Sequence, residues 1–337
     1  MAYYFKDIIN MRNMRLFRKV TSIIALAIVC FYGNVANAQN LKFGKPSQLE
    51  WSMVGWSEAP DAEAVVLCKT LKVNYELSGD YKNYDSTQSE LSMDNYANSG
   101  INKYISEGRT TMTYDVKIRT KILKENGVGY ANMDIVVFDD EKDKGAYDEF
   151  KSFSVVVFKN VNGKIKKTKY TRDIFEDERF NESFVIRHVK VPDVQVGDII
   201  EYQYVLFSKR VTFLYDWTVQ EDIPVMYSSC DLDIPVFLQF NMQVPKHPFV
   251  TSKVEEGVIF LPQEGSDLQA PKRCKSNHFT IVGKDMLPLK LDLLRNKQME
   301  AAQVEASGKI AAVINVPYIE KPIFLPKSLR HIMLFPK

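Results

Sequence analysis

The chain has 337 residues, of which 45% are hydrophobic and 26% are charged, and its formal net charge is +2. This composition excludes a disordered or fibrous protein and allows one large domain or two of modest size. A charge so close to zero gives no indication of a nucleic-acid partner.

The first 38 residues have the pattern of a secretory signal peptide. Basic residues precede an apolar run from Ile23 to Tyr32, and small residues follow at Ala36-Asn37-Ala38, where signal peptidase cleaves. We therefore expect cleavage after Ala38 and an exported protein, periplasmic or extracellular. The apolar run is short for a membrane span, so we expect no span after cleavage. Lipidation at Cys30 stays open.

From about residue 63 the apolar side chains alternate with a period of two, which is typical of half-buried strands. Residues 114–122 alternate in this way, with Arg119 and Lys121 on the face predicted to be solvated. Asn126-Gly127 follows, before a β-rich run that begins at Tyr130, and this dipeptide favours a hairpin turn. A second Asn-Gly pair, Asn162-Gly163, predicts a hairpin between residues 153–158 and 164–170.

Three further alternating runs cover residues 200–206, 213–219 and 238–244. Helical pattern is scarce, and residues 291–307 are the best candidate. The fold class predicted is mainly β: a large antiparallel β-sandwich or sandwiches, few helices and a Pro-rich C-terminal tail. The predicted domains are a signal peptide (1–38), a β-sandwich domain (39–222), a second β-rich part continuous with the first (223–312) and a Pro-rich linker or tail (313–337).

Several segments, in chain order, carry a family resemblance. They are Glu63–Leu67, Arg119–Leu123 with Gly127, Val191–Tyr202, Trp217 with Pro224-Val225, and Asn315-Val316-Pro317 with Pro322 and Pro326. Over residues 49–326 the chain resembles the uncharacterised β-rich domain that precedes a transglutaminase-like core in secreted bacterial proteins. Within the most specific segment, Pro192, Asp193, Gly197 and Asp198 also predict a pair of structural turns from their own backbone preferences.

The resemblance implies an exported β-sandwich accessory domain beside a papain-like domain with a catalytic Cys, His and Asp. The chain ends at Lys337, where that core would begin, so the family's catalytic residues have no positions here. We therefore expect no catalytic, cofactor-binding or metal-binding residues. The partners expected are a transglutaminase-like core, or a protein or glycan surface in the cell envelope.

Three cysteines remain after signal cleavage: Cys68, Cys230 and Cys274. Cys68 follows an apolar run and is typical of a small core residue. Cys230 and Cys274 are the candidate disulfide pair, which export permits but the sequence does not prove. Basic neighbours would favour a Cys274 thiolate, although no scaffold typical of a nucleophile follows it.

Other candidate sites have stronger structural explanations. Trp51 and Trp56 are candidates for an exposed binding surface, or else for anchors of the N-terminal segment. Residues 139–145 hold several acids, but lysines interrupt them and Phe150 replaces the glutamate that would close a calcium loop. The lysine-rich run 164–169 is typical of a charged sheet edge, with an anionic surface site as the alternative. Zinc, Walker and serine-elbow motifs are absent from the sequence.

The sequence leads to three hypotheses. The first is a non-catalytic accessory or binding module of an exported transglutaminase-like protein. The second is the N-terminal fragment of a cysteine transglutaminase- or protease-like enzyme whose core is missing or encoded separately. The third is a glycan-binding or adhesion module of the envelope.

Overall fold

A computed structural model describes residues 42–77, 110–140, 142, 147–236, 238, 240–244, 247–260, 273–289 and 309–314. The chain divides into two compact units, Met1–Lys42 and Phe43–Lys337, and every described strand belongs to the second. The predicted signal peptide (1–38), the predicted helix (291–307) and all but the first two residues of the predicted tail (313–337) lie outside the described residues. Among the described residues, no helix is long and apolar enough to cross a membrane.

The described elements are short helices and mostly long strands. The helices are α2 (Gln48–Ser52) and the 3-10 helices η2 (Glu125–Ala131) and η3 (Arg172–Ile174). The strands are β1 (Ala64–Leu77), β2 (Thr110–Ile122), β3 (Met133–Phe138), β4 (Asp148–Val161), β5 (Lys164–Tyr170), β6 (Phe175–Arg179), β7 (Phe184–Val189), β8 (Ile199–Ser208), β9 (Trp217–Thr218), β10 (Val225–Pro235), β11 (Phe240–Gln243), β12 (Val250–Phe260), β13 (Arg273–Met286) and β14 (Lys309–Ile314).

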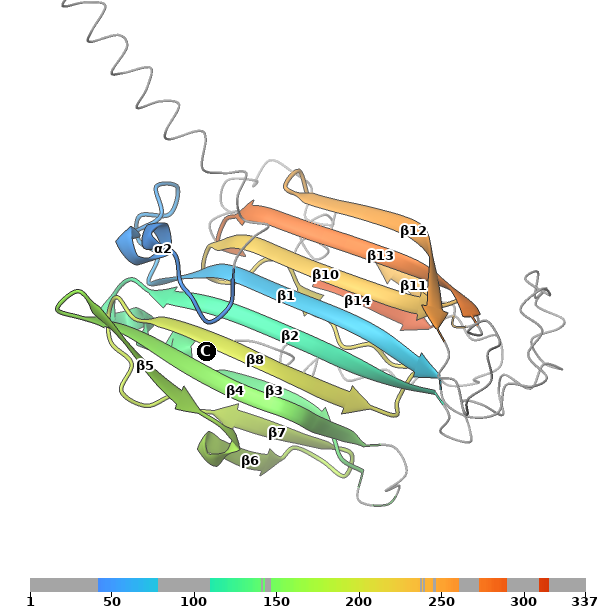
Figure 1. The fold of residues 1–337 in the computed structure, drawn as a ribbon. Coiled ribbons are helices and arrows are strands. Elements are labelled where there is room, and N and C mark those ends of the chain that lie inside the picture. The colour runs from blue at the N-terminus through green and yellow to red at the C-terminus, as the bar shows by residue number, and fades with distance from the viewer. Residues whose placement is uncertain are drawn as a thin grey trace, which may run out of the picture. The chain divides into compact units, whose positions relative to one another are not determined.

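The strands form one large sheet and two small ones (Figure 1). The large sheet has eight strands in the order β12-β13-β10-β1-β2-β8-β4-β5, and the small sheets are β11-β14-β9 and β3-β7-β6. The prediction of a mainly β fold is confirmed. Its antiparallel character needs one correction, because β1 and β10 run parallel, with Val66 opposite Val225. A parallel pair requires a long crossover, which alternation within single strands does not reveal.

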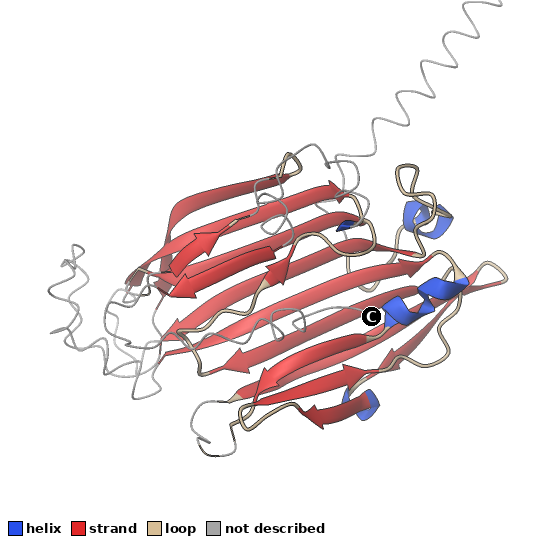
Figure 2. Ribbon diagram, turned by 180° about the vertical axis from the view of Figure 1, so that it is seen from behind, coloured by secondary structure: helices blue, strands red, loops and turns tan. Residues whose placement is uncertain are grey.

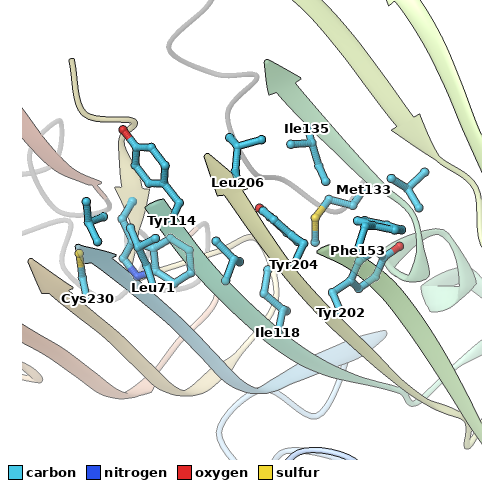
Figure 3. Packing of buried hydrophobic residues seen from close by; sticks show 14 of the residues in the cluster. Leu71, Tyr114, Ile118, Met133, Ile135, Phe153, Tyr202, Tyr204, Leu206 and Cys230 are labelled. Atoms are coloured by element: carbon cyan, nitrogen blue, oxygen red, sulfur yellow. The ribbon is translucent and has the colours of Figure 1, made fainter. Parts of the chain in front are cut away.

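The core lies between the large sheet and the two small sheets. Along β2 the even positions from Met112 to Ile118 are buried, as the period-two pattern predicts. Figure 3 shows Met133 and Ile135 of β3 beside the side chains of the large sheet, and Trp217 of β9 belongs to the same cluster. The view from behind places the strands of both small sheets over this inner face (Figure 2). The architecture is therefore a sandwich with one wide layer and a divided second layer.

Only one of the two predicted hairpins forms. Asn162 and Gly163 both have positive φ, at 52° and 80°, and join the antiparallel pair β4 and β5 as predicted. The hairpin predicted at Asn126-Gly127 is wrong, because these residues lie in η2 and β3 then pairs with β7 instead of β2. The chain leaves the large sheet at this point to begin the small sheet that covers it.

The strand predicted over residues 213–219 is correct only at Trp217 and Thr218, which form β9. Phe213 and Tyr215 pack instead against a small cluster of Val136, Phe184 and Ile186. The alternating side chains of this segment therefore pack as part of a connection between two sheets. Backbone pairing does not extend along the whole run.

The packing of Gly127 generates a test of the corrected connection. A methyl group at this position would lie 2.1 Å from the carbonyl oxygen of Glu63, which already accepts from the backbone N–H of Leu123 and Lys124 at 2.9 Å each. Gly127→Ala should therefore lower the free energy of unfolding by about 1–3 kcal/mol through overpacking. Urea denaturation measures the change.

The matched control is Gly55→Ala, because a methyl group there meets nothing within 4 Å. Its effect should stay within about 0.5 kcal/mol. Equal effects of the two substitutions would contradict the close approach of Gly127 to Glu63.

Candidate functional site: the N-terminal segment on the outer face of the sheet

The segment from Phe43 to Trp56 lies on the outer face of the large sheet, opposite the main core. Its only α-helix, α2, begins at Ser47, whose side chain accepts from the N–H of Glu50 while the Glu50 carboxylate accepts from the N–H of Ser47. This reciprocal capping box is encoded by the Ser-x-x-Glu spacing. It also fixes the direction in which the Glu50 side chain leaves the helix.

A buried ionic cluster holds this segment to the sheet. Arg119 of β2 is 0% exposed, and its Nη1 donates to Glu50 Oε1 at 2.5 Å while its Nε donates to Glu201 Oε1 of β8 at 2.7 Å. The other oxygen of Glu201 accepts from the backbone N–H of Gly44 at 2.6 Å, and the Arg119 guanidinium lies 5.1 Å from the ring centroid of Phe43. One guanidinium therefore joins two strands and the N-terminal segment.

Lys121, two residues further along β2, makes a second attachment. Its Nζ donates to the carbonyl oxygens of Glu50 and Trp51, at 2.8 Å each, and lies 5.6 Å from the Trp51 ring centroid. Burial lowers the pKa of Lys121, and the charge of Glu50 opposes that shift. The prediction of a solvated face at Arg119 and Lys121 is therefore wrong, because the N-terminal segment covers both side chains.

Trp51 and Trp56, the candidate binding residues, are both partly buried. They pack with Met53 against a cluster formed by Val65, Leu67, Phe158 and Ile199 on the outer face of the sheet. These two rings accordingly contribute to the covering of the sheet. The sequence around these two residues could not distinguish this packing from an exposed aromatic pair.

Cys68 lies beneath the same segment, opposite Arg119 in the ladder between β1 and β2. The thiol is free and buried, and burial raises its pKa to about 12, with Arg119 lowering it and the carboxylates Glu50 and Glu201 raising it. A thiol in this state is almost entirely protonated near neutral pH and is a poor nucleophile.

The structure does not bring the two candidate disulfide cysteines together. Cys230 has a free, buried thiol opposite Ile281 of β13, and burial raises its pKa. Cys274 lies opposite Ile259, seven positions from Ile281 along the same strand. Seven residues of a strand span about 23 Å, whereas bonded cysteines have Cα atoms within about 7 Å.

The turn residues of the Val191–Tyr202 segment precede β8 in the chain and are hydrogen-bonded to the end of β2. Asp193 and Gly197 have positive φ, at 59° and 89°. Gly197 N–H donates to the Ile122 carbonyl at 2.9 Å, and the Asp198 carboxylate accepts from the Gln195 N–H at 2.8 Å. Lys159 lies 3.0 Å from that carboxylate, so the segment is fixed to β4 as well.

A second buried ion pair was not foreseen from the sequence. A bulge between Val66 and Cys68 turns Lys69 to the inner face, where its Nζ contacts Glu221, lies 3.0 Å from Thr218 Oγ1 and lies 4.5 Å from the Trp217 ring centroid. Lysine at this point breaks the apolar alternation of β1. Lys69 is in phase with the buried residues Leu71, Val73 and Tyr75, and this phase could have indicated a buried charge.

His188 of β7 bridges the three strands of one small sheet. Its Nδ1 lies 2.8 Å from Asp134 of β3, and its Nε2 lies 2.9 Å from Glu178 of β6. The two hydrogen bonds, first with Asp134 and then with Glu178, raise its pKa. These three strands carry no cysteine, so this imidazole is committed to carboxylates rather than to a thiol.

Chemically, the described clusters fix segments in place. The Arg119 cluster and the Lys69 pair each combine opposite charges with hydrogen bonds from neighbouring groups, which is what a buried charge requires. Among the described residues no group of three or more His, Cys, Asp or Glu side chains has a geometry that could hold a metal ion. Asp139 of the acidic loop contacts Arg179, and most of the loop's remaining residues lie outside the described part.

Comparison with known proteins finds one family model that matches a part of this chain. Residues 108–259, from just before β2 through almost all of β12, match the model of DUF3857, a domain of unknown function with a solved structure. No curated protein matches the chain.

Among solved structures, the chain is similar to the crystal structure of a candidate protease from Parabacteroides distasonis, with 13% sequence identity and a TM-score of 0.42. The match covers 76% of this chain and 41% of that one. The chain therefore spans less than half the length of that protein, and a likeness this distant carries no functional argument.

The Arg119 cluster leads to a stability prediction. Arg119→Met leaves Glu50 and Glu201 buried without their cation, so the free energy of unfolding should fall by about 3–5 kcal/mol. Limited proteolysis should also cut residues 43–56 sooner, because their attachment is lost. Chemical denaturation and mass spectrometry of the fragments measure the two effects.

Lys117→Met is the matched control on the same face of β2. Lys117 pairs with Asp115 at 3.4 Å, and both side chains are more than a third exposed, at 38% and 36%. Removal of this pair should change stability by no more than about 0.5 kcal/mol. If the two variants were equally stable, the Arg119 cluster would not be what holds the segment.

His188 leads to a prediction of pH dependence. Its folded-state pKa lies above the ordinary value of 6.5, so its stabilising effect is complete below that value and is lost as pH rises through the folded pKa. His188→Gln should therefore reduce the free energy of unfolding more at about pH 5.5 than at about pH 8.5. A reduction of the same size at both pH values would show that the imidazolium does not stabilise the small sheet.

Proposed function

We propose that this chain is the non-catalytic β-sandwich accessory module of an exported transglutaminase-like protein. The role proposed is to support or position a catalytic core, or to bind a protein or glycan surface in the cell envelope. The carrying observation is that the thiol of Cys68 is enclosed between the sheet and the N-terminal segment, next to two carboxylates that disfavour a thiolate.

Two further observations support the proposal. The DUF3857 match covers β2 to β12, which includes the Val191–Tyr202 segment that carries the resemblance to transglutaminase-associated domains. Cys230, the other thiol with a described side chain, is packed inside the main core. Export, with cleavage after Ala38, is part of the same proposal and rests on the sequence pattern of the first 38 residues.

The alternative of an enzyme fragment differs from this proposal only in where the core is encoded. The glycan-binding alternative predicts a row of exposed aromatic rings, whereas Trp51 and Trp56 pack on the sheet. No observation in the described residues favours the glycan alternative over the accessory module.

The proposal is tested with the purified chain on peptide and amide substrates. We expect no hydrolysis or transamidation above the rate without protein, at any pH between about 6 and 9, because a buried protonated thiol does not attack an amide. Turnover that disappears in Cys274→Ala, with Cys68→Ala as the matched control, would overturn the proposal. Loss of turnover in Cys68→Ala instead would contradict the enclosure of Cys68.

A further inference from the structure

The two edges of the large sheet differ in a way that bears on association. β5 forms one edge, and its seven residues include four lysines, which repel an incoming strand. β12 forms the other edge, at the opposite side of the sheet in Figure 1. It has eleven residues, all six from Thr251 to Glu256 are exposed, and only one residue of the strand is a lysine. The β12 edge therefore lacks the protection that β5 has.

The side chains of β12 form two different stripes. Val254 lies opposite Phe279 of β13, which packs on the main core, so Val254 points to the inner face together with Val250 and Val258. Val254 is 58% exposed and Val258 is 44% exposed. Lys253 and Glu255 lie on the outer face and contact each other at 2.5 Å. An apolar stripe and a charged pair thus lie on opposite faces of an edge that pairs with no further strand among the described residues.

We propose that β12 pairs antiparallel with the β12 of a second copy of this chain, about a two-fold axis through Val254. In this register a residue that precedes Val254 by a given number of positions faces the residue that follows Val254 by the same number in the other copy. Val250 then faces Val258, and Val254 faces its own copy, which extends the apolar stripe across the junction. Lys253 of each copy faces Glu255 of the other copy, so two attractive ion pairs join the two strands on the outer face.

Neighbouring registers lack this complementarity. A two-fold axis moved by one residue sets Lys253 or Glu255 against its own copy, which is destabilising for like charges. An axis moved by two residues lies at Ser252 or Glu256 and separates both Lys–Glu pairs. Only the register centred on Val254 matches the apolar stripe and the charges together.

The proposed contact closes on itself. Both β12 edges are paired within one dimer. The edges that remain on the joined large sheet are the two lysine-rich β5 strands, which resist the addition of a further strand. Growth through the edges of the large sheet therefore stops at two copies, with a continuous sheet across the junction. This inference is independent of the proposed accessory function, because it uses only the strands at the two edges of the large sheet.

Sedimentation velocity of the purified full chain tests the inference by charge reversal. Wild type should show a reversible monomer–dimer equilibrium. Lys253→Glu and Glu255→Lys should each raise the dimer dissociation constant at least about tenfold, because each variant turns both attractive pairs into repulsive ones. The double variant Lys253→Glu/Glu255→Lys restores opposite charges and should return to within about threefold of wild type.

Lys166→Glu, on the exposed β5 edge, is the matched control and should leave the dimer unchanged. A chain that stays monomeric up to about 100 µM would overturn the proposal. So would a dimer that Lys253→Glu does not weaken, or a double variant that fails to recover. Because the double variant carries both substitutions, its recovery also shows that neither new side chain by itself prevents dimer formation.

Discussion

The constraint that shapes this protein is the apolar inner face of the eight-stranded sheet, which must be removed from water. Buried side chains line that face from β13 to β4, a width of six strands. A three-stranded sheet is too narrow to cover six strands at about 4.8 Å each, so two are required. The chain therefore leaves the large sheet after β2 to build β3, and again after β8 to build β9.

Buried charges lie where additional segments of the chain pack on the faces of the large sheet. Arg119 lies where the N-terminal segment crosses the outer face, and Lys69 contacts Trp217 and Glu221 in the connection before β10. The desolvation of such pairs offsets much of their attraction, so they add little net stability compared with apolar residues of the same size. We infer that their main effect is on specificity, because any other position of the segment would leave a buried charge unpaired.

Local features of the sequence predict the strands but not their partners. Period-two alternation locates β2 and β8, and Asn162-Gly163 predicts the hairpin of β4 and β5 because both residues adopt positive φ. The same dipeptide at Asn126-Gly127 is misleading, since contact with Glu63 and the demand for a second layer override the local preference. Burial of Arg119 was not predictable either, because it depends on a segment about 70 residues earlier that folds over it.

The parallel pairing of β1 with β10 has a consequence for how the molecule is assembled during synthesis. β1 is the first of the described strands to leave the ribosome, yet its parallel neighbour follows only after β2 through β9 have been made. Until then one side of β1 presents unpaired amides beside Leu71 and Val73, a state prone to intermolecular pairing. The nascent chain thus contains an incomplete sheet in which one edge of β1 stays unpaired until β10 has been made. Such a fold benefits from chaperones that hold early strands apart during translation.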